Sequence, residues 1–316
     1  MEYRHLGRSG LRVSEVSLGS WLTFGASVDA ASATEIVRCA LDHGINLFDT
    51  ADVYADGAAE EALREALRGV PRHRVVIATK AFFPRSDDPN DRGLSRKHLF
   101  ESVEASLRRL ATDYLDLHQC HRPDPSVPVE ETVRAYEDLI RQGKILYWGT
   151  SEWRASQLLD AVRAAETWRA YRPISNQPQY SLLRRGIERE VLPVCEREGI
   201  GQIVWSPLAQ GVLTGKYRPG APPAGSRAAH PTASRFMTAF LAPEVLERVE
   251  KLRPIARELG VTVAQLSLAW CLRRTDVASV IVGATRPEHV AENAKASDVK
   301  LTPEALDRIE ALFPSS

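Results

Sequence analysis

The sequence has little of what marks nucleic-acid-binding, membrane-spanning or secreted proteins. Lysine and arginine together number 41, as do aspartate and glutamate, so the formal net charge is zero, whereas dedicated nucleic-acid binders are usually basic. No run approaches the roughly 20 apolar residues that cross a bilayer, and the first residues lack the basic-then-apolar pattern of a signal peptide. We therefore expect a cytoplasmic protein with no nucleic-acid partner and no membrane insertion.

Cysteine is scarce as well. The four cysteines, Cys39, Cys120, Cys195 and Cys271, are far apart, and no two have the spacing of a metal or redox pair. The histidines show no metal-ligand spacing either. We expect buried thiols in a reducing compartment and no metal site.

Two common phosphate-binding motifs are absent or incomplete. No Gly-x-Gly-x-x-Gly occurs, so an open-sheet dinucleotide-binding fold would lack its phosphate turn. Residues 211–217 resemble a P-loop only loosely, because the glycines are one residue too close and Tyr217 replaces the hydroxyl residue that binds magnesium.

What the chain does have is a regular alternation of strand-like and helix-like segments. The expected strands are 16–19, 46–49, 75–79, 114–120, 145–149, 174–176, 200–206 and 277–283. The expected helices are 33–44, 59–67, a helix that Ser95 would cap, 129–142, 155–165, 186–198, 263–273 and 287–296. Eight strand–helix units in 316 residues favour an α/β fold, a closed (β/α)8 TIM barrel, as a single domain over residues 1–316.

Three segments fall outside this alternation. Residues 3–15 read as a hairpin that could close the bottom of the barrel. Residues 207–243, after the seventh strand, lose all periodicity and form a functional lid or a surface insertion. Residues 302–313 read as a last short helix that begins at Thr302 and Pro303.

Four ionisable side chains gather where three successive strands end. Asp49 ends the second strand, and Tyr54 follows five residues later. Lys80 and His121 come directly after the third and fourth strands. The carboxyl ends of the strands form the active face of such a barrel, and this set suits a proton donor whose pKa is lowered by a cation.

Seven motifs follow one another in a fixed order. They are YRHLGRSGLRVS (3–14), GINLFDTA (44–51) with Tyr54, RGLSRKH (92–98), HRPDP (121–125), WGTS (148–151), WSPLA (205–209) and GKY (215–217). Together they resemble the aldo-keto reductases over nearly the whole chain. The resemblance is closest to the branch that contains the β subunits of voltage-gated potassium channels and their bacterial relatives.

The resemblance implies a catalytic role for each of the four residues. Tyr54 would be the general acid that protonates a carbonyl oxygen as hydride arrives from NADPH, and Lys80 would lower its pKa. Asp49 would keep Lys80 protonated and oriented, and His121 would hydrogen-bond the carbonyl oxygen. Channel β subunits carry Asn where this chain has His121, whereas most active reductases carry His.

The same resemblance assigns the cofactor site. Its residues are Ser20, Trp21, Asp49, Ser151, Gln177, Trp205, Ser206, Pro207, Leu208, Ala209, Gln210, Gly211, Lys216, Arg227, Gly283, Thr285, Arg286, His289, Glu292 and Asn293. Trp205 would stack on the nicotinamide. The pyrophosphate would be lined by Ser206, Leu208 and Gln210, with Lys216 and Arg227 reaching it from the long loop. Thr285, Arg286 and His289 would meet the 2′-phosphate.

Two positions depart from the family pattern. Glu152 stands where the family usually has Asn and channel subunits have Arg. His289 stands where Arg or Gln is usual.

The substrate side would be lined by Trp21, Tyr54, Phe82, Phe83 and His121, which favours an apolar or aromatic carbonyl. Phe83 could equally be plain core.

Three functions stay open at this point. The first is an NADPH-dependent reductase of aldehydes or ketones. The second is an NADPH-binding, redox-sensing or channel-associated subunit with little turnover. The third is a barrel of another chemistry, such as an isomerase or a metal-free lyase. The expected partner is a small carbonyl substrate, and assembly into a homo-oligomer stays undecided.

Overall fold

A closed barrel of parallel strands forms the centre of the computed structural model, which describes residues 1–315 except 219–222, 224–225, 230–233, 235–236 and 238–239. Its eight strands among the described residues pair in the order β10-β3-β4-β5-β6-β7-β8-β9. They are β3 (Val16–Gly19), β4 (Leu47–Asp49), β5 (Val76–Ala81), β6 (Leu115–Cys120), β7 (Ile145–Ser151), β8 (Ser175–Gln177), β9 (Gly201–Trp205) and β10 (Val277–Val282). This is the (β/α)8 TIM barrel that the sequence predicts.

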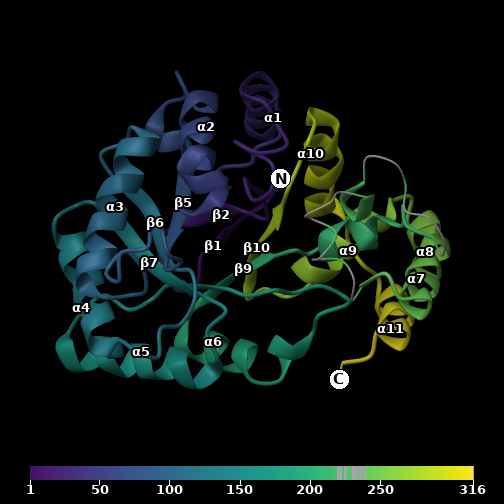
Figure 1. Cartoon of the computed structure of the whole chain (residues 1–316). Coiled ribbons are helices and arrows are strands. Elements are labelled where there is room, and N and C mark those ends of the chain that lie inside the picture. The colour runs from purple at the N-terminus through teal and green to yellow at the C-terminus, as the bar shows by residue number, and fades with distance from the viewer. Residues whose placement is uncertain (219–222, 224–225, 230–233, 235–236, 238–239, 316) are drawn as a thin grey trace.

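Helices lie around the outside of the barrel (Figure 1). They are α1 (Ala30–Asp42), α2 (Ala58–Ala66), α3 (Arg96–Leu110), α4 (Val129–Arg141), α5 (Ala155–Trp168), α6 (Val191–Glu198), α7 (Pro243–Glu250), α8 (Leu252–Glu258), α9 (Val263–Leu272), α10 (Pro287–Ala294) and α11 (Pro303–Leu312). Ser95 caps α3 and Thr302 caps α11, each through its side chain, as the sequence predicts.

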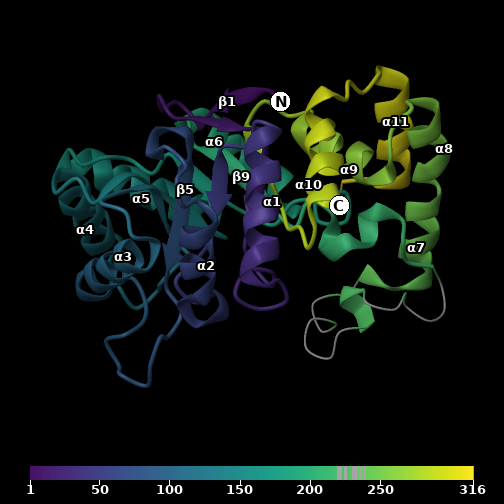
Figure 2. The same ribbon diagram turned by 90° about the horizontal axis from the view of Figure 1, so that it is seen from above.

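The hairpin of β1 (Tyr3–His5) and β2 (Arg12–Ser14) lies across one end of the barrel (Figure 2). Leu6 and Val13 are fully buried among apolar side chains of the barrel interior. Gly7 has a φ of +60°, and a Cβ there would lie 2.2 Å from the carbonyl oxygen of Gly199. Only glycine fits so tight an approach, and the hairpin thereby closes the amino end of the barrel, as expected.

Two of the expected helices differ from those observed, and two observed helices were not expected. The segment expected as one helix over 186–198 is a short 3-10 turn, Gly186–Glu188, followed by α6. Pro193 explains the break, since its ring would clash with the helix one turn earlier. The helix expected over 287–296 ends at Ala294 and continues as a 3-10 turn. Helices α7 and α8 were not expected at all.

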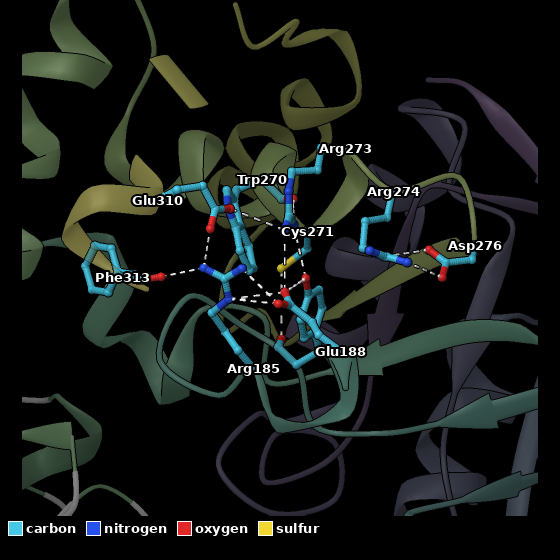
Figure 3. Close-up of polar contacts among 10 residues, drawn as sticks. Arg185, Glu188, Trp270, Cys271, Arg273, Arg274, Asp276, Glu310 and Phe313 are labelled. Atoms are coloured by element: carbon cyan, nitrogen blue, oxygen red, sulfur yellow. Dashed lines mark hydrogen bonds and ion pairs between the residues drawn. The ribbon is translucent and has the colours of Figure 1, made fainter. Parts of the chain in front are cut away.

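The C-terminal helix is fastened by a partly buried polar cluster (Figure 3). The guanidinium of Arg185 lies 2.8 Å from Glu188 and 2.5 Å from Glu310, and it also donates to the carbonyl oxygen of Phe313. Glu310 accepts from the indole of Trp270 at 3.0 Å. The turn before α6 is therefore tied to α11, and α11 is tied to α9.

The remaining expectations concern membranes, cysteines and metals. No single helix in the described part of the chain is long and apolar enough to cross a membrane. One pair bent by 88°, Pro243–Glu258 with Val263–Leu272, passes by length and composition only. All four cysteines are free; three are buried and Cys39 is partly exposed. Among the residues described, no cluster of three acidic, histidine or cysteine ligands could hold a metal.

Candidate active site

The two-residue period of the strands brings Asp49, Lys80 and His121 to the inside of the barrel. Successive side chains of a strand point to opposite faces. In β4 Leu47 belongs to the interior cluster and Phe48 to the outer one, so Asp49 faces inward. In β5 Val76 and Ala78 are interior, which places Lys80 inside as well. The parallel register pairs Asp49 with Ala78, two residues before Lys80. The side chains of Asp49 and Lys80 therefore both lie at the carboxyl end of the barrel.

Lys80 is the centre of a buried ionic cluster. Its Nζ lies 2.6 Å from Asp49 Oδ2 and donates to the backbone carbonyl of Thr50 at 2.7 Å. The phenolic oxygen of Tyr54 is 3.5 Å away. The side chain of Lys80 is fully buried, so its charge acts on Tyr54 with little screening by water. The four residues predicted from the strand ends do come together.

The charge states of this cluster follow from burial and proximity. Although burial opposes it, the pKa of Lys80 is raised, because Asp49 and Tyr54 stabilise the ammonium. Burial raises the pKa of Tyr54 above its ordinary value, and Lys80 and Arg122 only partly oppose this. Lys80 acts to lower the pKa of Tyr54, as expected, but in the protein alone the desolvation of the phenolate outweighs the ammonium and the pKa is raised.

His121 is a neutral side chain beside Tyr54. Burial, with the nearby charges of Lys80 and Arg122, holds its pKa well below the ordinary value. Its ring lies edge-on to Tyr54 at 5.6 Å and to Phe83 at 4.9 Å between centroids. Its buried Nδ1 has no hydrogen-bond partner in the described part of the protein. A neutral imidazole keeps one N–H that can donate to a ligand.

Aromatic side chains lie at or just after the carboxyl ends of three strands, and Phe83 contacts His121 of this cluster. Phe82 and Phe83 follow β5 and meet edge-to-face at 5.4 Å. Trp21 follows β3 and meets Trp205, at the end of β9, at 6.2 Å and 82°. All four rings are partly exposed. Such surroundings suit an apolar ligand with a few polar groups.

The turn after β9 has the backbone of an anion-binding nest. Ser206, Ala209, Gln210 and Gly211 all have positive φ, between 46° and 95°. Turns of this kind gather backbone N–H groups toward one point. The Nζ of Lys216 lies 3.5 Å from the position that a Cβ on Gly211 would occupy, which adds a positive charge beside the nest. Leu208 is partly buried and Pro207 is buried in the same turn.

A second cationic corner lies where β10 gives way to α10. Arg286 caps α10 and donates from Nε to His289 Nε2 at 3.0 Å, and Thr285 lies 3.5 Å from His289. Gly283, Thr285 and Arg286 are exposed. Further along α10, Glu292 is exposed and Asn293 is buried. A cation at a helix N-terminus suits a phosphate.

Other residues expected to bind the cofactor hydrogen-bond to one another and to residues next to Lys80. Gln177 donates from Nε2 to Asp49 Oδ1 at 2.8 Å, and Ser151 donates to the backbone carbonyl of Gln177 at 2.9 Å. The hydroxyl of Ser20 donates to Thr50 at 2.9 Å. The side chain of Arg227 lies outside the described residues.

Two contributors to the site were not foreseen. The carbonyl oxygen of Thr50 binds Lys80, but backbone atoms leave no trace in a sequence pattern. Glu152, noted only as a departure from the family, accepts the indole N–H of Trp205 at 2.7 Å. Its position directly after the strand residue Ser151 was the signal that could have found it.

Comparison of the sequence with known proteins relates the chain to one family. Residues 15–313 match the sequence model described as "Aldo/keto reductase family". A protein of Arabidopsis thaliana named "Probable voltage-gated potassium channel subunit beta" is 50% identical over 100% of this chain and 97% of its own length. A protein of the same name from Oryza sativa subsp. japonica is 48% identical, with the same coverage. A "Putative voltage-gated potassium channel subunit beta" of Schizosaccharomyces pombe is 44% identical over 98% of this chain and 93% of its own length.

Proposed function

Because the chain belongs to the aldo/keto reductase family, we propose that it reduces aldehydes or ketones to alcohols with NADPH as the hydride donor and Tyr54 as the proton donor. The observation that carries this proposal is the buried Asp49–Lys80 pair, 2.6 Å between charged atoms, set beside Tyr54 and a neutral His121. Burial of such a pair costs desolvation energy, and ionisable groups with perturbed pKa values cluster at functional sites.

Each of the four residues has a distinct task in the proposed reaction. Tyr54 gives its phenolic proton to the carbonyl oxygen, and its raised pKa keeps it protonated, and so loaded, at neutral pH. Lys80 stabilises the phenolate that remains. Asp49 holds Lys80 charged and in place. His121 donates a hydrogen bond to the same carbonyl oxygen, which polarises it and fixes its position.

The residues at the carboxyl end of the barrel fit a dinucleotide with phosphates at two points. NADPH, when bound, supplies the hydride. The nest over 206–211 with Lys216 suits the pyrophosphate, and Arg286 with His289 suits the 2′-phosphate. Trp205 offers its ring to the nicotinamide, and Ser151 and Gln177 lie where its carboxamide would reach. Aromatic side chains favour an apolar or aromatic substrate, and the reaction belongs to the cytoplasm, where NADPH is available.

The test is NADPH oxidation by the purified protein with a small set of carbonyls. Methylglyoxal, glyceraldehyde, a nitrobenzaldehyde and a simple ketone cover the main substrate types. Tyr54→Phe should lower kcat by about 10²- to 10⁴-fold, the usual contribution of a general acid, while NADPH still quenches protein fluorescence. Tyr171→Phe, at an exposed tyrosine, is the matched control. Wild-type turnover in Tyr54→Phe would refute the proposed role.

The names of the relatives favour a second candidate, an NADPH-binding accessory subunit of a potassium channel. These relatives are 44–50% identical over 98–100% of this chain, and the same experiment tests this second role. It predicts saturable NADPH binding with no turnover of any carbonyl. His121 favours the reductase, because its neutral N–H is available to a carbonyl oxygen.

A further inference from the structure

We propose that Glu152 is a positioning residue that holds the indole of Trp205 and, through its negative charge, favours the oxidised form of the nicotinamide. The effect on the nicotinamide rests on the proposed function. The positioning of the Trp205 indole concerns the protein alone and follows from the contacts of Glu152.

One carboxylate oxygen of Glu152 accepts two hydrogen bonds, one from the segment just after β8 and one from the last residue of β9. Oε1 lies 2.7 Å from the indole Nε1 of Trp205 and 2.6 Å from the backbone nitrogen of Gln179. Gln179 and Trp205 are themselves joined in a β-bridge. The carboxylate therefore binds both the ring and the backbone beside it, which fixes the ring relative to the barrel.

The backbone of Glu152 is shaped for this contact. Its φ is +58°, a left-handed conformation that costs an ordinary residue about 1 kcal/mol or more. Its N–H donates to the carbonyl of Gln177 at 3.3 Å, which anchors the turn to β8. Strain of this kind persists only where the surroundings hold it, and here the two hydrogen bonds of the side chain do so.

The charge of Glu152 has a consequence beyond position. A hydrogen bond from an indole N–H to a carboxylate makes the ring richer in electrons, because the bond polarises the donor. An electron-rich indole attracts a cation over its face more strongly. The oxidised nicotinamide ring is positively charged and the reduced ring is neutral, so Glu152 stabilises bound NADP⁺ relative to bound NADPH.

Two substitutions separate position from charge. Glu152→Gln keeps an acceptor oxygen for Trp205 and Gln179 but removes the charge, whereas Glu152→Ala removes both. Glu61→Gln, at an exposed carboxylate on α2, is the control for the loss of one charge. Each protein is also made with Trp205→Phe, so that the difference spectrum isolates Trp205 from the other five tryptophans.

The first measurement is the near-UV circular dichroism and fluorescence of Trp205 without nucleotide. We expect Glu152→Ala to change the Trp205 spectrum and Glu152→Gln to preserve it. An unchanged Trp205 spectrum in Glu152→Ala would overturn the positioning role. This readout is independent of whether the protein binds NADPH.

The second measurement is the pair of Kd values for NADPH and NADP⁺. We expect Glu152→Gln to weaken NADP⁺ relative to NADPH by about two- to fivefold, the size of an exposed cation–π contact, and Glu152→Ala to weaken both. An unchanged ratio in Glu152→Gln would overturn the role of the charge. If the wild type bound neither nucleotide, the proposed function would fail, and the spectra without nucleotide would still decide the positioning role.

Discussion

Asp52 is an unusual side chain beside the proposed proton donor. It is 1% exposed, and Ser102 donates to Oδ2 at 2.9 Å, but Oδ1 has no partner among the described residues. Burial raises the pKa of Asp52 to about 6; the Ser102 hydroxyl opposes this shift and the carboxylate of Glu60 adds to it. A carboxyl with a raised pKa binds its proton more tightly in the folded than in the unfolded chain.

This predicts a pH-dependent effect of Asp52→Asn on stability. The contribution of protonated Asp52 is fully present below about pH 4 and is lost as the pH rises through about 6. The neutral variant should therefore be more stable than the wild type at pH 7.5, by up to about 3 kcal/mol, and nearly equal at pH 4 and below, with the difference growing between pH 4 and pH 6. Chemical unfolding at several pH values measures the difference.

The control for this prediction is Asp87→Asn, which changes an exposed carboxyl and should leave the free energy of unfolding nearly unchanged at every pH. A gain from Asp52→Asn that did not vary with pH would contradict the titration.

At the level of elements, α3 shows how a single cap sets a helix start. Ser95 Oγ accepts from the backbone nitrogen of His98 at 3.2 Å, satisfying one of the free N–H groups of the first turn. The same helix carries Ser102, which holds Asp52. The cap therefore supports the packing beneath the active-site loop as well as the helix itself.

Ser95→Ala should lower the free energy of unfolding by about 1 kcal/mol, the usual value of an N-cap. Ser95→Asp should restore most of it, since a carboxylate also caps well. Urea unfolding of the three proteins measures both effects. Equal stability of the alanine variant and the wild type would show that α3 begins without help from Ser95.

The elements also show which parts of the molecule a sequence can predict. Strands β5 and β6 are buried on both faces. In β5 the apolar residues 76–78 lead up to Lys80, and His121 directly follows β6, so the site follows from the carboxyl ends of these strands. Helices α7 and α8 are only eight and seven residues long, too short to show a clear period. The position of Glu152 after β7 could be found from the sequence, but its contact with Trp205 also depends on a φ of +58°, which the residue type does not predict.

At the scale of the whole molecule, Arg185 joins the C-terminal helix α11 to the turn before α6. Its side chain is 8% exposed and meets Glu188, Glu310 and the carbonyl of Phe313 (Figure 3). Two segments that are distant in sequence, the turn at 185–188 and the end of α11, therefore share one guanidinium. Removal of the Arg185 guanidinium leaves the carboxylates of Glu188 and Glu310 without their main cationic partner in a partly buried environment.

Arg185→Met should destabilise the protein by about 3 to 5 kcal/mol, as expected when one member of a buried ionic cluster is removed. Arg308→Met is the matched control on α11, because the pair of Arg308 with Glu258 is exposed and should contribute at most about 1 kcal/mol. Thermal unfolding compares the two. Equal losses of stability from Arg185→Met and Arg308→Met would contradict the larger contribution expected of Arg185.

The pairing of β3 with β10 has a consequence for how a cell makes this protein. Val16 lies beside Val280, so the barrel cannot close until almost the entire chain has left the ribosome. At about 5 to 20 residues per second, β3 waits on the order of tens of seconds for its neighbour. During that time the nascent chain presents an open sheet edge, which makes it a natural client for chaperones that shield unpaired strands.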